Sequence, residues 1–355
     1  MTTDNNDLLV SLQRGIPVAR RPFAELGETL ELSEAEVLGT LRALFDEKQA
    51  RRFGAVFDVR RLGYLSALCA VDVPEDEVET RAAALTPYTG ITHCYVRGWP
   101  PELPLDTPGA GGGAHVPNLW FTLARLDGLF QQELDELKAA MAPHRILVLP
   151  AIRRFKIDVV FDPSRRNRAE IFPGIEARAI TPDVAGEDIS FRDFSDRDKA
   201  IVRAMQGNLP LSASPFDDVA AQLGCDVDAL IHTLREWSAS GILRRIGVIL
   251  RHRNMGFKAN AMCVWKVPAD QALEAGRALA SFPQVTHCYQ RPRDPDFDFD
   301  LYAMIHTAAW PTTIDLFGQL QRAAGLKNGR VLCSLREFKK TSPKYFSEDA
   351  DDRGN

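Results

Sequence analysis

The sequence predicts an α+β protein built from two tandem copies of one unit, in which short helices precede a β-α-β-β-α-β domain. Two observations support this prediction. The hexapeptide "THCYVR" at 92–97 recurs as "THCYQR" at 286–291. Each hexapeptide also sits at the same place in a similar order of helix-like and strand-like segments, so the whole unit is repeated.

Colinear matches extend the repeat on both sides of the hexapeptide. "ARRFGAVFDVRRLGY" (50–64) aligns with 243–257, and "NLWFTLAR" (118–125) aligns with 300–307. The spacing between matching residues is 193 or 194 up to the hexapeptide and 182 or 183 after it. The second copy therefore lacks about a dozen residues of the Pro/Gly-rich segment 98–117, as expected for a surface loop.

The helical part of each copy resembles a winged helix-turn-helix. In the second copy, Ser195 is a suitable N-cap for a first helix, with apolar residues at Ile201, Val202 and Met205. The segment 214–243 then reads as a helix, a glycine-containing turn and a second helix. "RRIGVIL" (244–250) follows and predicts a small β-wing.

The remainder of each copy follows the ferredoxin-like order. In the second copy we expect strands at 258–268, 284–291, 299–306 and 329–338, and helices at 270–282 and 310–325. In the first copy we expect strands at 64–74, 90–97, 118–125 and 144–152, and helices at 75–85 and 129–141.

The predicted domains follow from these elements, and the two halves are expected to form an internal pseudo-dimer. They are a helix-turn-helix-like domain at 1–63, a ferredoxin-like domain at 64–161, a linker at 162–194, a second helix-turn-helix-like domain at 195–257, a second ferredoxin-like domain at 258–346 and a disordered tail at 347–355.

Composition excludes several classes of protein. The 355 residues carry a formal net charge of −5, which disfavours a generic nucleic-acid coat but not a local basic pocket. None of the six cysteines forms a C-x-x-C pair, which disfavours zinc-knuckle and thioredoxin readings. No apolar run resembles a secretory signal or a membrane span, so we expect a cytoplasmic protein with reduced thiols and no membrane contact.

The helix-turn-helix pattern makes DNA binding the first alternative to test. A recognition helix needs Arg, Lys, Asn or Gln facing the major groove. The expected recognition helix at 226–240 has a net charge of −2, and its counterpart at 33–47 has −3. Acidic helices would be repelled by phosphates, so we expect them to serve in packing, dimerisation or pocket walls.

The hexapeptides are the first candidate site. Alternation along a strand places His93, Tyr95 and Arg97 on one face, and the second copy does the same with His287, Tyr289 and Arg291. One face then offers an acid–base group, a hydrogen-bond donor and a carboxylate clamp. A polar edge facing water is the plainer alternative, but retention of all three residues in both copies favours function.

Other cations and aromatic residues form the second candidate set. Two arginines precede a glycine in each copy, and these are Arg51, Arg52, Arg244 and Arg245. They could bind a substrate carboxylate, keep a phosphate contact inherited from a regulator, or lie in a solvated turn. The terminal strands carry further cations, which are Arg153, Arg154, Lys156, Arg336, Lys339 and Lys340. Of these we choose Arg154 and Lys339 for substrate binding. The alternative is that these side chains belong to solvated edge strands and face water. Trp120 could stack on a flat ligand or belong to the core.

The same residues carry a family resemblance. The helix-turn-helix followed by a ferredoxin-like domain resembles the Lrp/AsnC regulators at the level of the fold. The paired "RRFGAV"/"RRIGVI", the paired "THCYxR", "NLWFTL" and the terminal "RRFK"/"REFK" resemble siroheme decarboxylases over nearly the whole chain, in particular the fused two-subunit form of haem d1 biosynthesis.

This resemblance implies an enzyme, a carboxy-lyase that removes CO2 from the C12 and C18 acetates of siroheme to give 12,18-didecarboxysiroheme, in haem d1 or alternative haem biosynthesis. Such a reaction needs an acid beside the ring and a proton donor at the new methyl group, and we choose His93 and His287 for these roles. We expect Tyr95 and Tyr289 to orient them or to relay protons, with arginines on the retained carboxylates. No metal site or cofactor of the protein's own is expected, since the iron arrives with the substrate.

Several alternatives stay open at this stage. The chain could instead be a DNA-binding regulator or a non-catalytic tetrapyrrole carrier. The two halves could share one pocket or own one each, and the replacement of Trp120 by Tyr302 suggests unequal sites. A homo-oligomer and contacts with other haem d1 pathway proteins are also open.

Overall fold

The computed structural model describes residues 3–110, 116–157, 160–162, 183–184, 193–251 and 254–347. Most of the predicted linker at 162–194 and nearly all of the predicted tail at 347–355 lie outside these residues.

The helices and strands follow a similar order in the two halves, as the repeat predicts. The helices are α1 (Thr3–Arg14), α2 (Pro22–Leu30), α3 (Glu34–Asp46), η1 (Glu75–Glu77), α4 (Val78–Leu85), α5 (Asp127–Met141), α6 (Asp196–Met205), α7 (Pro215–Leu223), α8 (Val227–Ala239), α9 (Ala272–Ala280) and α10 (Trp310–Ala323). The strands are β1 (Ala50–Phe57), β2 (Tyr64–Val71), β3 (Ile91–Gly98), β4 (Leu119–Leu126), β5 (Ile146–Pro150), β6 (Arg153–Ile157), β7 (Asp183–Val184), β8 (Leu243–Leu250), β9 (Ala259–Trp265), β10 (Val285–Gln290), β11 (Leu301–Thr307) and β12 (Arg330–Lys340).

Local signals in the sequence account for the helix-turn-helix of the second half. The Ser195 hydroxyl accepts a hydrogen bond from the Asp198 amide, and the Asp198 carboxylate accepts one from the Ser195 amide, which completes a capping box at α6. Helix α7 ends at Gly224, which adopts the left-handed conformation with φ of +61°. Asp226 then caps α8, which confirms the predicted helix–turn–helix order.

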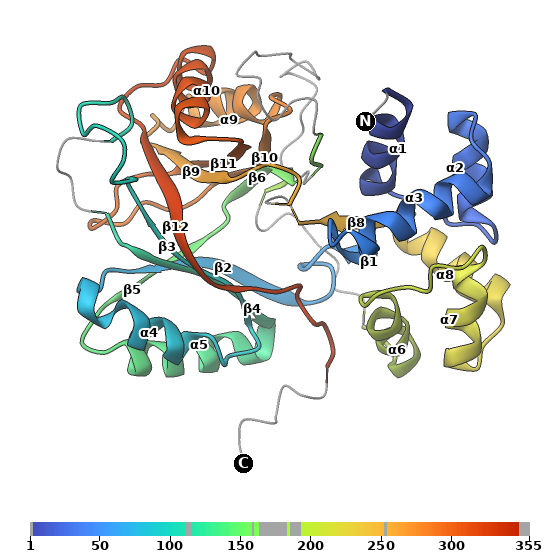
Figure 1. Cartoon of the computed structure of the whole chain (residues 1–355). Coiled ribbons are helices and arrows are strands. Elements are labelled where there is room, and N and C mark those ends of the chain that lie inside the picture. The colour runs from blue at the N-terminus through green and yellow to red at the C-terminus, as the bar shows by residue number, and fades with distance from the viewer. Residues whose placement is uncertain are drawn as a thin grey trace.

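The helix-turn-helix units of the two halves share a single apolar core. Leu12 and Phe53 from the first half and Leu234 and Trp237 from the second are fully buried in the same cluster. The expectation that these helices serve in packing is therefore confirmed, and Figure 1 shows α1–α3 and α6–α8 gathered on one side of the molecule.

The predicted β-wing is wrong in its pairing. Strands β1 and β8 do not belong to separate wings, because they pair with each other antiparallel as a two-stranded sheet. Gly54 lies opposite Gly247, and an added Cβ at Gly54 would lie 2.1 Å from the Gly207 carbonyl oxygen. The two matching segments thus join the halves at a place where neighbouring backbone leaves no room for side chains.

The two ferredoxin-like domains merge into one ten-stranded sheet by exchanging strands. The strand order is β5-β2-β4-β3-β12-β9-β11-β10-β6-β7. Strand β6 leaves the first half to pair with β10, and the end of β12 leaves the second half to pair with β3. This reciprocal exchange confirms the predicted internal pseudo-dimer.

Helices cover the outer faces of the curled sheet. In Figure 1, α4 and α5 lie below the strands of the first half, and α9 and α10 lie above those of the second. Each helix pair closes its own apolar core. Between the halves, Trp120 and Leu149 pack in one cluster with Met262 and Tyr302, so the inner faces of the two domains meet. Within the described part of the chain, every helix is too short or too polar to cross a membrane.

Candidate active site

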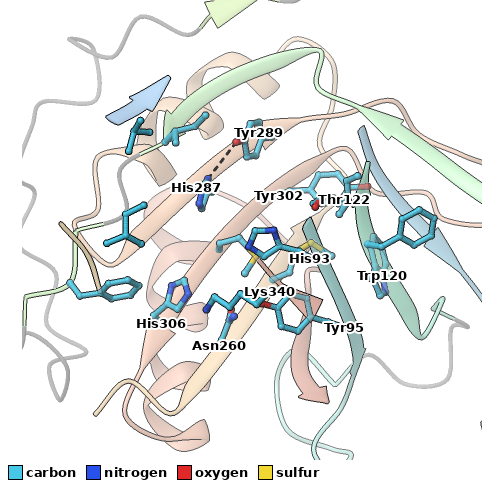
Figure 2. Close-up of a pocket in the computed structure, with 18 of the residues that line it drawn as sticks. His93, Tyr95, Trp120, Thr122, Asn260, His287, Tyr289, Tyr302, His306 and Lys340 are labelled. Carbon is cyan, nitrogen blue, oxygen red and sulfur yellow. Dashed lines mark hydrogen bonds between the residues drawn. The ribbon is translucent and has the colours of Figure 1, made fainter. Parts of the chain in front are cut away.

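A cavity of about 670 Å³ lies between the inner faces of the two halves, and both hexapeptides reach it. Figure 2 shows His93 and Tyr95 from β3 lying in the same pocket as His287 and Tyr289 from β10. Within the described residues both copies line one shared cavity, which favours the alternative of one shared pocket over one pocket in each half.

The alternation expected for the hexapeptides is confirmed. Cys94 and Cys288 are fully buried in the cores under the helices. The side chains at the alternate positions, on the face opposite to the two cysteines, line the cavity. They are His93, Tyr95, Arg97, His287, Tyr289 and Arg291. In each copy the imidazole stacks with the phenol two residues away, with ring centroids 6.2 Å apart in the first and 6.0 Å in the second.

The cavity wall is strongly cationic. Among the described residues that line it, seven are arginine or lysine and none is acidic: Arg14, Arg51, Arg97, Arg244, Arg245, Arg291 and Lys340. The wall between them is largely apolar and aromatic, with Leu68, Trp120, Met262 and Tyr302. A chain with a net negative charge thus contains a cavity suited to a flat, apolar ligand that carries several carboxylates.

His93 is held in place by hydroxyl groups and sits among cations. Its Nδ1 lies 2.9 Å from the Thr92 hydroxyl, which lies 2.9 Å from the Thr122 hydroxyl on β4. Burial, followed by the positive charges of Lys340 and Arg51, lowers the pKa of His93 to about 3. The imidazole is therefore neutral near pH 7 while the cavity holds no anion.

His287 has a different hydrogen-bond partner. Its Nδ1 lies 3.4 Å from the Tyr289 hydroxyl, the contact drawn as a dashed line in Figure 2. Burial, followed by the charges of Arg291, Arg244 and Arg245, lowers the pKa of His287 to about 4. The two histidines share a neutral state, but their surroundings are not equivalent.

Arg97 and Arg291 occupy matching positions at the ends of the hexapeptides. The Arg97 guanidinium lies 5.2 Å from the Tyr95 ring centroid, and Arg291 lies 4.7 Å from that of Tyr289. Arg97 donates to the Ser334 hydroxyl at 2.9 Å, and Arg291 donates to the Leu149 carbonyl at 2.5 Å. Each arginine thus hydrogen-bonds to a strand of the opposite half and ties the halves together at the cavity wall.

Arg51 retains hydrogen-bonding capacity. Its Nη2 donates to the Ser342 hydroxyl at 3.3 Å, while its buried Nε and Nη1 have no hydrogen-bond partner within the described residues. Burial, with the charge of Arg251 acting in the same direction, lowers its pKa. An anion in the cavity would satisfy such a group, because an unpaired buried donor is costly.

Three residues predicted to bind substrate lie outside the cavity. Arg52 donates to the Gln206 carbonyl. Arg154 forms a buried ion pair with Asp58, with Nη2 to Oδ2 at 2.6 Å. The Lys339 ammonium donates to the backbone carbonyls of Thr86 and Tyr88 at 2.7 and 2.8 Å. The other predicted residues, including Trp120, line the cavity.

The structure adds residues that sequence reasoning did not choose. Arg14 from α1, Thr122 from β4, and Asn260 and His306 from the second half also line the cavity. His306 could have been found, because it continues the alternation of Tyr302 and Met304 along one strand. Arg14 had no comparable signal, since it depends on how the helical units pack.

Within the described residues, no cluster of three or more His, Cys, Asp or Glu side chains could hold a metal ion. The histidines of the cavity instead stand among cations, which would oppose binding of a free divalent ion. The donor set fits an anionic organic ligand better than a metal ion.

Comparisons with known families agree with this architecture. A family described as "Siroheme decarboxylase NirDL-like HTH domain" matches residues 5–51 and 198–244. A second, described as "AsnC-like ligand binding domain", matches 61–156 and 254–339. Both families match twice, once in each half.

Curated relatives match over nearly the whole chain. Siroheme decarboxylase of Hydrogenobacter thermophilus is 33% identical over 353 residues, covering 98% of this chain and 97% of the relative. The siroheme decarboxylase NirDL subunit of Paracoccus pantotrophus is 33% identical and covers 96% and 97%. The siroheme decarboxylase beta subunit of Desulfovibrio desulfuricans is 37% identical over 155 residues, covering 43% of this chain and 98% of its own.

Two solved structures cover 98% of the chain. The crystal structure of the siroheme decarboxylase NirDL matches with a TM-score of 0.71 at 29% identity. A second crystal structure of NirDL, in complex with an iron-uroporphyrin III analogue, matches with a TM-score of 0.71 at 28% identity.

Proposed function

This chain belongs to the siroheme decarboxylase family, and we propose that it removes CO2 from the C12 and C18 acetates of siroheme to give 12,18-didecarboxysiroheme. The observation that carries the proposal is one cavity, shared by the two halves, in which the histidines of both hexapeptides stand among seven cations and, among the described lining residues, no acidic side chain. A related protein in this family binds an iron-uroporphyrin III analogue, a macrocycle with a similar set of carboxylates.

The cations of the cavity bind and orient the carboxylates. Arg51 has two buried nitrogens available, and Arg97 and Arg291 stand beside the two histidines. Bidentate arginine contacts to carboxylates are strong and fix geometry. The carboxylates that remain on the product supply the binding energy, which leaves each reacting acetate to be positioned at a histidine.

Each decarboxylation breaks one carbon–carbon bond and forms one carbon–hydrogen bond. The carboxylate group of the acetate leaves as neutral CO2, and the electron pair of the broken bond stays on the methylene carbon attached to the ring, where the conjugated macrocycle delocalises it. A proton from His93 or His287 then converts this carbon to a methyl group. Transfer of the acetate from water to a mostly apolar cavity also favours loss of its charge.

Substrate binding itself prepares the proton donors. In the empty cavity both histidines are neutral, because of burial and the neighbouring cations. Carboxylates placed among those cations cancel their repulsion and add attraction, which raises the pKa of both imidazoles. Each histidine therefore takes up its proton when substrate arrives, and Tyr289 orients His287 through the contact at 3.4 Å.

Anaerobic incubation of the protein with siroheme, followed by mass spectrometry, tests the proposal. Loss of two CO2 masses is expected. Bound pigment of unchanged mass would instead identify a tetrapyrrole carrier, and tight, sequence-specific DNA binding at physiological salt would identify a regulator.

Separate His93→Gln and His287→Gln variants assign the two steps. Each is expected to slow decarboxylation by about 100-fold or more, the usual contribution of a positioned acid. Full activity in both variants would refute the assignment. The carbon–carbon lyase class, a cytoplasmic location, and a homo-oligomer or contacts with other haem d1 proteins remain part of this proposal.

A further inference from the structure

The two ends of the cavity differ at positions that the repeat makes equivalent. "IRRFK" (152–156) matches "LREFK" (335–339), so the next residues, Ile157 and Lys340, correspond to each other. The strand exchange brings each of them to a histidine: Lys340 pairs in register with His93, and Ile157 pairs with His287. At this register position a cation therefore stands beside His93 and an aliphatic side chain beside His287, whose cationic neighbours come from other positions.

The strand on the other side of each histidine shows the same difference. Thr122 lies next to His93 in register, and its counterpart Met304 lies next to His287. Figure 2 shows Lys340 and His93 close together in the pocket. The Thr341 amide donates to the Thr92 carbonyl at 2.8 Å, which fixes the end of β12 beside β3 and keeps Lys340 at this place. One end of the cavity is therefore polar and cationic, and the other is apolar between its arginines.

The proposed substrate has a matching near-symmetry. Its C12 and C18 acetates lie on neighbouring rings and are exchanged by a two-fold axis through the meso carbon between them. The neighbours of these acetates are not exchanged. Across the adjoining meso carbon, one acetate faces a propionate, and the other faces a carbon that bears both a methyl and an acetate. A nearly two-fold cavity could therefore accept the macrocycle in two orientations.

We infer that Lys340 selects one of these orientations, by binding the retained carboxylate that lies across the adjoining meso carbon from the acetate at His93, and so decides which acetate is lost at which histidine. The inference rests on the proposed function. In one orientation this carboxylate belongs to a propionate, and in the other it belongs to an acetate on a methyl-bearing carbon, so the two orientations place it differently with respect to Lys340. Ile157 offers no hydrogen bond to a carboxylate at the opposite end. Lys340 is on this account a specificity-determining residue for the order of the two losses.

Exchange of the two equivalent side chains tests the inference. The variants are Lys340→Ile, which makes the ends alike, the double variant Lys340→Ile with Ile157→Lys, which moves the cation, and Lys340→Arg, which keeps it. After a single turnover with siroheme, the two mono-decarboxylated isomers are separated by chromatography. The unchanged protein and Lys340→Arg should form one isomer in excess, Lys340→Ile should form both in comparable amounts, and the double variant should favour the opposite isomer.

Results that contradict the inference are equally distinct. An unchanged isomer ratio in Lys340→Ile or in the double variant would overturn it, and so would equal isomers from the unchanged protein. If the unchanged protein released no CO2 at all, the proposed function would fail instead. Lys340→Gln serves as a second variant should the isoleucine variant fold poorly, and it is expected to give the same mixed isomers.

Binding of iron uroporphyrin III gives a readout that does not depend on catalysis. Spectroscopic titration should show affinity about 10-fold weaker or more in Lys340→Ile, as expected for loss of a hydrogen bond to a charged group. Lys340→Arg should bind nearly as tightly as the unchanged protein. Equal affinity in all three proteins would show that Lys340 contacts no carboxylate and would overturn the inference.

Discussion

Lowering the pH from 7 to 5 should cost the empty protein about 4 kcal/mol of unfolding free energy through His93 and His287 alone. In the folded protein their pKa values are about 3 and about 4, against an ordinary value of 6.5. Between pH 6.5 and about 4 the unfolded chain binds a proton at each histidine that the folded chain does not bind, so stability falls as the pH falls. At about 1.4 kcal/mol for each pH unit below 6.5, each histidine contributes about 2 kcal/mol at pH 5.

Urea unfolding at several pH values between 7 and 5 measures this effect. Carboxylates elsewhere also titrate in this range, so the comparison is with the double variant His93→Gln, His287→Gln. Its stability should fall by about 4 kcal/mol less over the same range. Saturation with iron uroporphyrin III should also make the unfolding free energy of the unchanged protein depend less on pH, because the ligand raises the pKa of both histidines and they bind protons in the folded state. If both proteins lost stability in parallel, the histidines would not be held neutral and the proposed proton uptake would be refuted.

Two further predictions concern the frame around the cavity. Arg154→Met should destabilise the protein by about 3–5 kcal/mol, because it removes the guanidinium that pairs with the buried Asp58 carboxylate at 2.6 Å. Since Arg154 lies outside the cavity, affinity for iron uroporphyrin III should change little in the folded variant, and a large loss of affinity at normal stability would contradict this placement. Gly54→Val should disrupt the β1–β8 pairing, because the Gly207 carbonyl occupies the space of the new side chain; thermal unfolding should show a lower midpoint, and an unchanged midpoint would contradict the close approach.

The Asp58–Arg154 pair also shows why a cation predicted from a sequence motif to bind substrate need not face the ligand. Burial acts to raise the pKa of Asp58, yet Arg154, with Arg244 and Arg60, holds that pKa below its ordinary value. Arg154 therefore stabilises an acidic group behind the cavity wall. A linear motif does not reveal which charges are already paired inside the fold.

The face of each hexapeptide could be predicted because strand alternation needs only the sequence. His93, Tyr95 and Arg97 share a face in the structure as they do by parity. The choice of Lys339 over Lys340 could not be made this way. Strand β12 has register shifts between Ser334 and Arg336 and between Glu337 and Lys339, and each shift changes which side chains face the cavity.

The partners of the strands were also beyond prediction from a single copy. The β-wing expectation for 244–250 treats each half as complete, whereas β1 and β8 pair across the halves. The exchange of β6 and β12 likewise depends on contacts between segments more than 100 residues apart. Local patterns identify elements, but they do not say which of two equivalent partners an element chooses.

The number of macrocycles bound per chain tests the shared cavity most directly. Iron uroporphyrin III is titrated into the protein at known concentration, and binding is followed by the absorption spectrum of the pigment. Saturation is expected at one macrocycle per chain. His93→Gln and His287→Gln should each perturb the spectrum of that one bound pigment. Saturation at two macrocycles per chain, with each variant altering a different half of the signal, would show that the halves work as separate sites.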